Sequence, residues 1–193
     1  MPRAFPVTHL PALLALLGLA ACAGAPQVGD AWRDVEEIAR HADWRVLKIR
    51  RRGETTCLAL NTDRLTQYFR GRTPLPPESR PVSRGLSGLA LASHPSLGVM
   101  PFYKAGTEIS AADQMAILAG PEQAEYPLAR DPQRPDSARP QDLGQSGAIA
   151  AELLRAPEVY VATITPGGVT IMDRFDTAGA GAAIAAAQGA CAG

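Results

Sequence analysis

Residues 158–191 read EVYVATITPGGVTIMDRFDTAGAGAAIAAAQGAC, and this stretch decides the fold. Glu158 to Thr163 and Val169 to Phe175 are both rich in the β-branched and aromatic residues that favour strands. Between them, Pro166-Gly167-Gly168 is a turn sequence of the kind that joins two antiparallel strands. The stretch therefore predicts a β-hairpin.

The hairpin is followed by an expected helix. Asp176 and Thr177 are a candidate N-cap pair, and the Ala-rich run from Ala178 to Cys191 has high helix propensity despite its glycines. One face of this helix would carry Ala180, Ile184, Ala187 and Cys191. We expect this apolar face to pack on the sheet.

Further strands are expected upstream, where short apolar runs are bounded by Gly and Pro. Residues 43–51 and 55–60 flank the turn candidate Arg52-Gly53-Glu54 and predict a second hairpin. The other candidate strands are residues 86–93 and 99–103, with the sheet continuing at 107–110 and 114–118.

Two more helices are predicted. The first begins at Asp30 as its N-cap and places on one face Trp32, Val35, Ile38 and Ala39. The second begins at Ser146 as its N-cap, runs to about Arg155, and has an apolar side made of Ile149, Leu153 and Leu154.

Two proline-rich segments predict loops. Residues 73–81 hold four prolines, which interrupt regular strand pairing. Residues 120–145 are rich in Pro, Asp, Gln and Arg, and predict a long exposed loop.

Composition and charge indicate the broad class of protein. The chain has 193 residues, of which 46% are hydrophobic and 20% charged, and this balance is typical of one soluble globular domain. Without residues 1–21 it carries 18 basic and 19 acidic side chains, a net charge of −1. A domain that binds nucleic acid would be distinctly basic, so we expect no nucleic-acid partner.

The N-terminus predicts export. Arg3 is followed by an apolar run from Leu10 to Ala21, which is too short to span a bilayer and suits the core of a signal peptide. Leu19-Ala20-Ala21-Cys22 matches the lipobox of bacterial lipoproteins, in which a dedicated peptidase cleaves before the cysteine and acyl chains are attached to it. We therefore expect residues 1–21 to be the signal and Cys22 to be the lipidation site.

This processing also predicts the domain organisation and the location. Residues 22–29 would form a lipidated tether, and residues 30–193 a single globular domain. Three acyl chains would make membrane attachment permanent, and the absence of Asp after Cys22 favours the outer over the inner membrane. The alternative is a plain secretory signal cleaved after Ala23-Gly24-Ala25.

After lipidation of Cys22, Cys57 and Cys191 remain, an even number in an oxidising compartment. One lies in a predicted strand and the other on the apolar face of the predicted C-terminal helix. We expect a disulfide that joins the helix to the sheet; the alternative is two free buried thiols.

Residues that could carry chemistry are few. His41 and His94 lie outside any metal-ligand spacing, and the chain has no Cys-x-x-Cys pair. Gly85-Leu86-Ser87-Gly88 and Gly144-Gln145-Ser146-Gly147 contain Gly-x-Ser, but the second glycine comes one position too early for a nucleophile elbow. We expect no catalytic residue, no metal and no cofactor.

A basic run is the densest charge feature: Arg45, Lys48, Arg50, Arg51 and Arg52. Arg50, Arg51 and Arg52 are candidates for contact with an anionic surface such as lipid or lipopolysaccharide. The alternative is a solvated strand face, balanced in part by Glu36, Glu37, Asp43 and Glu54.

Two stretches resemble a known family. Asp43-Trp44-Arg45-Val46, with Cys57 soon after it, is similar to the opening of the invasion-associated locus B family of alphaproteobacterial envelope proteins. Phe175-Asp176-Thr177-Ala178-Gly179, followed by the Ala-rich helix, is similar to the C-terminus of that family. The resemblance implies a mainly β fold, an immunoglobulin-like β-sandwich with a C-terminal helix packed on it, and a surface or periplasmic role.

These observations together predict a non-enzymatic envelope lipoprotein that acts through contacts with an unidentified envelope protein or with the envelope surface. Two other classes stay open at this stage. One is an envelope hydrolase whose site the sequence does not reveal, and the other is a periplasmic carrier of lipid or a small ligand.

Overall fold

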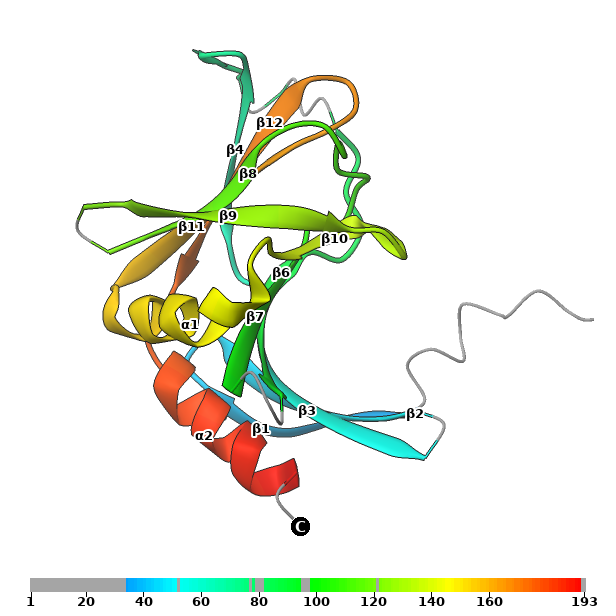
Figure 1. The fold of residues 1–193 in the computed structure, drawn as a ribbon, viewed down its shortest axis with the longest axis vertical. Helices are drawn as coiled ribbons and strands as arrows, with labels where there is room; N and C mark the ends of the chain where they lie inside the picture. The colour runs from blue at the N-terminus through cyan, green and yellow to red at the C-terminus, as the bar shows by residue number, and fades with distance from the viewer. Residues whose placement is uncertain are drawn as a thin grey trace, which may run out of the picture. The chain divides into compact units, whose positions relative to one another are not determined.

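The computed structural model describes residues 34–191, apart from residues 52, 77, 79–81, 95–97 and 121. In this part of the chain the elements are, in order, β1 (Val35–His41), β2 (Trp44–Arg51), β3 (Glu54–Asn61), β4 (Leu65–Arg70), β5 (Thr73–Pro74), β6 (Gly88–His94), β7 (Gly98–Lys104), β8 (Met115–Ala119), β9 (Ala124–Asp131), β10 (Arg134–Pro140), the 3-10 helix η3 (Leu143–Gln145), α1 (Ser146–Arg155), β11 (Glu158–Ile164), β12 (Val169–Asp176) and α2 (Ala180–Cys191) (Figure 1). None of the described helices is long and apolar enough to cross a membrane.

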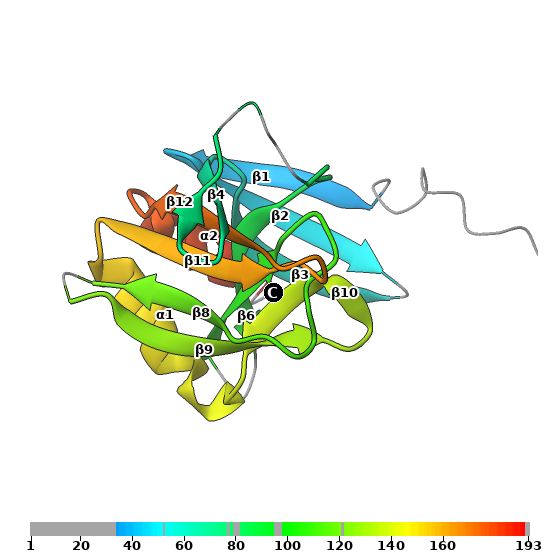
Figure 2. The ribbon, with the colours of Figure 1, turned by 90° about the horizontal axis from the view of Figure 1, so that it is seen from above.

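All twelve strands belong to one antiparallel sheet, in the order β1-β2-β3-β6-β7-β10-β9-β8-β11-β12-β4-β5. The sheet coils strongly, so that strands from its two halves contribute to a single apolar core (Figure 2). The mainly β prediction with a C-terminal helix on the sheet is confirmed. The immunoglobulin-like sandwich is not confirmed, because the strands form one continuous sheet rather than two.

The decisive stretch folds as predicted. β11 and β12 pair along their full length from Glu158 opposite Asp176 to Ile164 opposite Thr170. Helix α2 packs on β1, β2, β3 and β6, and its buried residues are Ala180, Ala183, Ile184 and Ala187. The small side chains allow the helix to lie close to the strands, and the apolar burial is what stabilises it there.

The segment that leads into α2 packs closely against the ends of β1, β2 and β3. The indole Nε1 of Trp44 and the side-chain amide of Asn61 both donate to the carbonyl oxygen of Asp176, each at 3.1 Å. Gly179 has a positive φ of 84°, and a Cβ there would lie 2.5 Å from the carbonyl oxygen of His41. The two stretches that carry the family resemblance are therefore in contact with each other.

The helix predicted from Asp30 is wrong over its described part. Val35 to His41 form β1, which pairs with β2 through a register shift between Glu37 and Ala39. The apolar spacing that resembled a helix arises from this bulge, because one extra residue in a strand shifts the alternation of the side chains. Asp30 and Trp32 lie outside the described residues.

The long loop predicted over residues 120–145 is also wrong, because it contains the hairpin of β9 and β10. Pro135 lies inside the register shift between Arg134 and Ala138, a position where a strand tolerates proline. At the turn, a side-chain oxygen of Asp131 accepts the backbone N–H of Gln133 at 2.9 Å. Local composition indicated a loop, but pairing with neighbouring strands decides the structure.

Four smaller corrections concern predicted caps, faces and strands. Ser146 is the first buried residue of α1 rather than its cap, a position that Gln145 occupies without a side-chain hydrogen bond. Leu154 is exposed, not part of the apolar side of that helix. Residues 107–110 form no strand, and the proline-rich segment after Arg72 begins with the two-residue strand β5.

Candidate functional site

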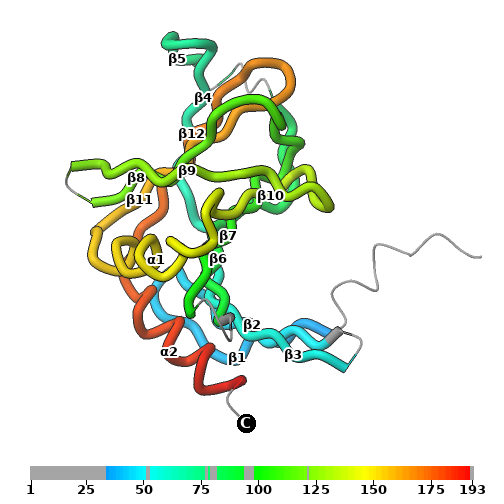
Figure 3. The backbone as a smooth tube through the Cα atoms, viewed as in Figure 1, coloured from blue at the N-terminus to red at the C-terminus, as the bar shows by residue number. Residues whose placement is uncertain are grey.

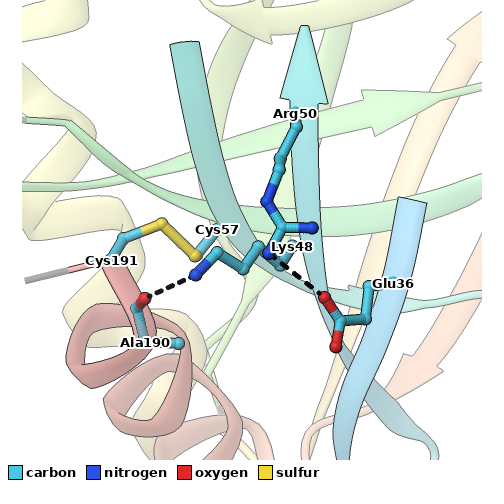
Figure 4. Close-up of a disulfide and its surroundings, with 6 residues drawn as sticks. All are labelled: Glu36, Lys48, Arg50, Cys57, Ala190 and Cys191. Carbon is cyan, nitrogen blue, oxygen red and sulfur yellow. Dashed lines mark hydrogen bonds and ion pairs between the residues drawn. A yellow bond between two sulfur atoms is a disulfide. The ribbon is translucent and has the colours of Figure 1, made fainter. Parts of the chain in front are cut away.

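The predicted disulfide between Cys57 and Cys191 is confirmed, and the alternative of two free thiols is wrong. Cys57 lies on β3 and is 2% exposed, and Cys191 is the last residue of α2. Their Cα atoms are 5.9 Å apart, and the bond joins residues separated by 134 positions (Figure 4). Cys22 lies outside the described residues, so its lipidation stays a prediction.

Lys48 reinforces the attachment of α2 beside the disulfide. It lies directly opposite Cys57 in the β2–β3 register. Its Nζ donates to the carbonyl oxygen of Ala190 at 3.4 Å (Figure 4). The last carbonyls of a helix have no partner within it, and a lysine there also favours the negative end of the helix dipole. This member of the basic run is therefore a C-terminal cap.

Two other members of the basic run are ion-paired across the β1–β2 hairpin. Arg45 Nε lies 2.7 Å from Glu37, and Arg50 lies 3.4 Å from Glu36. This pairing agrees with a solvated, partly balanced strand face. The side chain of Arg51 and all of Arg52 lie outside the described part, so contact of these arginines with an anionic surface stays a prediction.

The two Gly-x-Ser stretches hold buried serines. Among the described residues, neither the Ser87 nor the Ser146 hydroxyl has a hydrogen-bond partner. A serine nucleophile needs a base within hydrogen-bonding reach, and neither has one. His41 ends β1 and His94 ends β6. Across the described ranges, no three His, Cys, Asp or Glu side chains are grouped to hold a metal ion.

A buried charge network, which sequence analysis missed, lies where β12, β4 and β7 meet the segment before β6. At its centre is Asp173, whose side chain is 0% exposed, and Arg84, whose side chain is 5% exposed. Arg84 Nη1 and Nη2 donate to the two carboxylate oxygens of Asp173 at 2.8 and 2.5 Å. The hydroxyls of Thr66 and Tyr103 each donate to the same carboxylate at 2.6 Å.

Every donor of Arg84 is used. Besides the two bonds to Asp173, Nη1 donates to the Thr66 hydroxyl at 3.2 Å and Nη2 to the Tyr103 hydroxyl at 3.0 Å. The fifth donor, Nε, bonds to the carbonyl oxygen of Ala105 at 2.7 Å. A guanidinium has five N–H groups and a carboxylate accepts about four bonds, so both central groups are saturated.

The pKa values move away from neutrality throughout the network. Burial alone would raise the pKa of Asp173, but hydrogen bonds from Arg84, Thr66 and Tyr103 outweigh it and lower the pKa. Burial raises the pKa of the Tyr103 hydroxyl, and the charge of Asp173 raises it further. Burial alone would lower the pKa of Arg84, but its hydrogen bond to Asp173, the charges of Tyr103 and Asp173 and a bond to Tyr68 together raise the pKa.

This network therefore acts as a structural tie and not as an acid–base site. A general acid or base works best with a pKa near the working pH and with a free position for the reacting group. Here neither condition is met. The four side chains instead join three strands to a segment without regular structure, and truncating one partner would leave a buried charge uncompensated.

Beside the network lies an open cavity of about 920 Å³, lined by residues of β4, β5 and the segments next to them. β4 and β5 lie at the opposite end of the fold from α2 (Figure 3). Its described lining is Arg64, Thr66, Gln67, Tyr68, Phe69, Pro74, Leu75, Val82, Ser83 and Arg84. This lining contains two arginines and no acid. The cavity is thus a cationic surface with apolar and aromatic walls.

Arg64 is the arginine with unused hydrogen-bonding capacity. Its Nε lies 3.5 Å from a carboxylate oxygen of Asp173 and is buried without a hydrogen bond in the described structure. Its Nη1 donates to the carbonyl oxygen of Thr62 at 3.3 Å. Asp173 is already saturated, so the guanidinium of Arg64 is left without a neutralising hydrogen-bonded partner.

The sequence carried one signal for this site. Val169, Ile171, Asp173 and Phe175 have the same parity on β12, and all four are buried. An acid at an inward position of a predicted strand requires a buried partner, because a carboxylate without one is too costly to bury. Nothing local identified that partner as Arg84, which is 89 residues away.

No family model, no curated protein and no solved structure matches the chain.

Proposed function

We propose that this protein is a non-catalytic bacterial envelope lipoprotein, held by acyl chains on Cys22 at the outer membrane, whose globular domain acts by binding. The observation that carries the proposal is the disulfide between Cys57 and Cys191. Structural disulfides persist in oxidising compartments and are rare in the cytosol. Together with the lipobox at residues 19–22, the disulfide supports export followed by anchoring.

The non-catalytic part of the proposal is supported by the buried network. Its carboxylate and guanidinium are saturated by one another and by Thr66 and Tyr103, and their pKa values lie away from neutrality. Such a cluster has no proton to exchange near neutral pH and no free position for a substrate atom. An envelope hydrolase would need a different site.

Membership of the invasion-associated locus B family is part of the same proposal. Its support is the contact between the two stretches that carry the resemblance. Trp44 donates to the carbonyl oxygen of Asp176, and Gly179 lies against the carbonyl of His41. These contacts give a physical reason for Trp44, which donates to the second stretch, and for Gly179, which lies against His41 just before the first stretch.

The test is intact-mass analysis of protein from the membrane fraction, without reductant, for the wild type beside the Cys22→Ala variant. We expect the wild type to begin at an acylated Cys22 and to be lighter than its reduced form by the two hydrogens lost to the disulfide. We expect the variant to lose the lipid mass and to leave the membrane fraction. A wild-type protein that begins downstream of Cys22 without lipid would overturn the proposal.

The anionic-surface prediction for residues 50–52 belongs to the same function. It can be tested with the Arg50→Glu, Arg51→Glu and Arg52→Glu triple variant in the Cys22→Ala chain, which has no acyl anchor, and vesicles that contain anionic lipid. Reduced vesicle binding would support the contact. Unchanged binding would leave the run as a solvated strand face, as the Arg50–Glu36 ion pair indicates.

A further inference from the structure

We propose that the cavity along β4 binds a small organic anion, with its carboxylate or phosphate group held by Arg64. This inference rests on the proposed binding function and gives it a ligand class. It does not depend on the lipid anchor.

The charge balance around Asp173 is the first argument. Two guanidinium groups, those of Arg84 and Arg64, lie within ion-pairing distance of one carboxylate, at 2.5 and 3.5 Å. Arg84, Thr66 and Tyr103 together saturate the carboxylate with four hydrogen bonds, two of which come from Arg84. The cluster therefore carries one excess positive charge, and that charge belongs to Arg64.

The position of Arg64 is the second argument. Its side chain is 24% exposed and forms part of the cavity lining, while its Nε is buried without a hydrogen-bond partner among the described residues. A guanidinium that is partly exposed at a cavity wall is suited to carboxylate or phosphate, whose oxygens can accept two N–H groups at once. No acidic side chain in the described lining competes for it.

The rest of the lining restricts the ligand. A volume of about 920 Å³ is in the range of sites for small organic molecules and far larger than an inorganic ion requires. Phe69, Pro74, Leu75 and Val82 supply apolar and aromatic wall, and Gln67 and Ser83 supply polar groups. This combination fits a molecule with one anionic end and a partly apolar body.

Rigid support makes Arg64 an effective anchor. Residues 62–64 follow β3 directly, where Asn61 accepts the backbone N–H of Asp63 at 2.8 Å and donates to Asp176. Arg84, which lies against the same carboxylate of Asp173 as Arg64, is fixed by five hydrogen bonds. The cavity wall is thus held in place before a ligand arrives, which reduces the entropic cost of binding.

The experiment is isothermal titration calorimetry with the full-length lipoprotein in neutral detergent. The probes are 3-phenylpropionate, its neutral analogue 3-phenylpropanamide, and inorganic phosphate. We expect 3-phenylpropionate to bind and the amide to bind at least about tenfold more weakly, because a charge-assisted bond to Arg64 is lost.

Three variants locate the site. Arg64→Gln should weaken binding of 3-phenylpropionate by at least about tenfold. The matched control Arg70→Gln removes an exposed arginine at the end of β4, outside the cavity lining, and should leave the affinity unchanged. Leu75→Trp narrows the cavity without altering Arg64, and should also weaken binding.

The outcomes are distinct. Equal affinity for the acid and the amide, unchanged affinity in Arg64→Gln, or no binding of any probe at millimolar concentration would overturn the inference. Phosphate binding that matches 3-phenylpropionate and is lost in Arg64→Gln would support the anion site and assign it to free inorganic anions. Failure of this experiment with the acylated protein intact would reject the cavity ligand while leaving the envelope anchor in place.

Discussion

The sheet is secured differently at its two ends. At one end α2 lies on β1–β3, held by the disulfide of Cys57 with Cys191 and capped by Lys48 (Figures 1 and 4). At the other end, β4 and β12 are joined to the segment before β6 by the buried network of Arg84 and Asp173. The first fastening is covalent, and the second is electrostatic and fully hydrogen-bonded.

Only one of these two attachments, the disulfide, could be inferred from residue types. A disulfide needs only two cysteines in suitable elements, and both were visible in the chain. The network needs four side chains from separate segments, and each is unremarkable by itself. The end of the sheet with the Arg84–Asp173 network also holds Arg64, whose positive charge is not neutralised by a hydrogen-bonded acid. We therefore assign ligand binding to this end.

The largest expected effect comes from breaking the electrostatic fastening. Asp173→Asn should lower the free energy of unfolding by about 3–5 kcal/mol, because it leaves Arg84 charged and buried without a counterion. The measurement is chemical denaturation at pH 7. The control is Asp176→Asn on the same strand, an exposed residue whose side-chain oxygen accepts the Ala178 N–H and is retained in Asn, with an expected cost below about 0.5 kcal/mol. Equal costs for the two variants would contradict the structural role of the network.

Breaking the covalent fastening should have the next largest effect. The Cys57→Ser and Cys191→Ser double variant should lose about 2–4 kcal/mol, because the unfolded chain is released from a long closed loop. The wild type treated with reductant should fall to the same stability. If reductant left the wild-type denaturation midpoint unchanged, the disulfide would not contribute to stability.

The contact between the end of β1 and the segment that leads into α2 can be tested with a matched pair of glycine substitutions. Gly179→Ala and Gly168→Ala both place a side chain at positive φ, 84° and 72°. In Gly179→Ala the new Cβ also meets the carbonyl oxygen of His41, whereas around Gly168 there is open space. We expect Gly179→Ala to cost about 1–3 kcal/mol more, measured as the difference in free energy of unfolding. Equal losses would mean that the two segments separate easily.

The electrostatic end should also respond to acid. The pKa of Asp173 is lower in the folded than in the unfolded chain, so its stabilisation is complete above the unfolded value of about 4 and is lost as the pH falls below it. Denaturation between pH 7 and pH 2 should show the stability difference between wild type and Asp173→Asn shrinking below about pH 4. A difference that stayed constant would show that the carboxylate is not held in its charged form.

The smallest effect is expected from the exposed ion pair of Arg50 with Glu36. A double-mutant cycle with Arg50→Gln and Glu36→Gln should give a coupling below about 1 kcal/mol, and salt should reduce it further, because both side chains are more than half exposed. A coupling as large as that between Arg84 and Asp173 would remove the contrast between surface and buried charges.

Much of the fold could be predicted from the sequence. The β11–β12 hairpin, the β2–β3 hairpin and α2 follow from side-chain types and turn residues within short windows, and Cys57 and Cys191 followed from their expected elements. These features depend on neighbours in the chain, so local propensity is sufficient. The export signal and Cys22 are likewise local, and they stay predictions of the sequence.

The sequence predictions were wrong where pairing with distant strands determines the secondary structure. Residues 35–41 became β1 because β2 offers a pairing edge, and residues 124–140 became a hairpin despite their prolines because β7 and β8 flank it. The side-chain pattern within each segment could not show those edges.

The candidate site belongs wholly to the tertiary structure. Sequence analysis missed all four of its side chains, and Asp173 alone carries a local signal, as an acid among the inward residues of a strand. Its partners Thr66, Arg84 and Tyr103 come from positions 107, 89 and 70 residues away. Only the folded chain brings these side chains together. The buried charges of Asp173 and Arg84 are tolerated there because the hydrogen bonds around them are made. The surplus charge of Arg64, and with it the proposed ligand class, appears only once that network is complete.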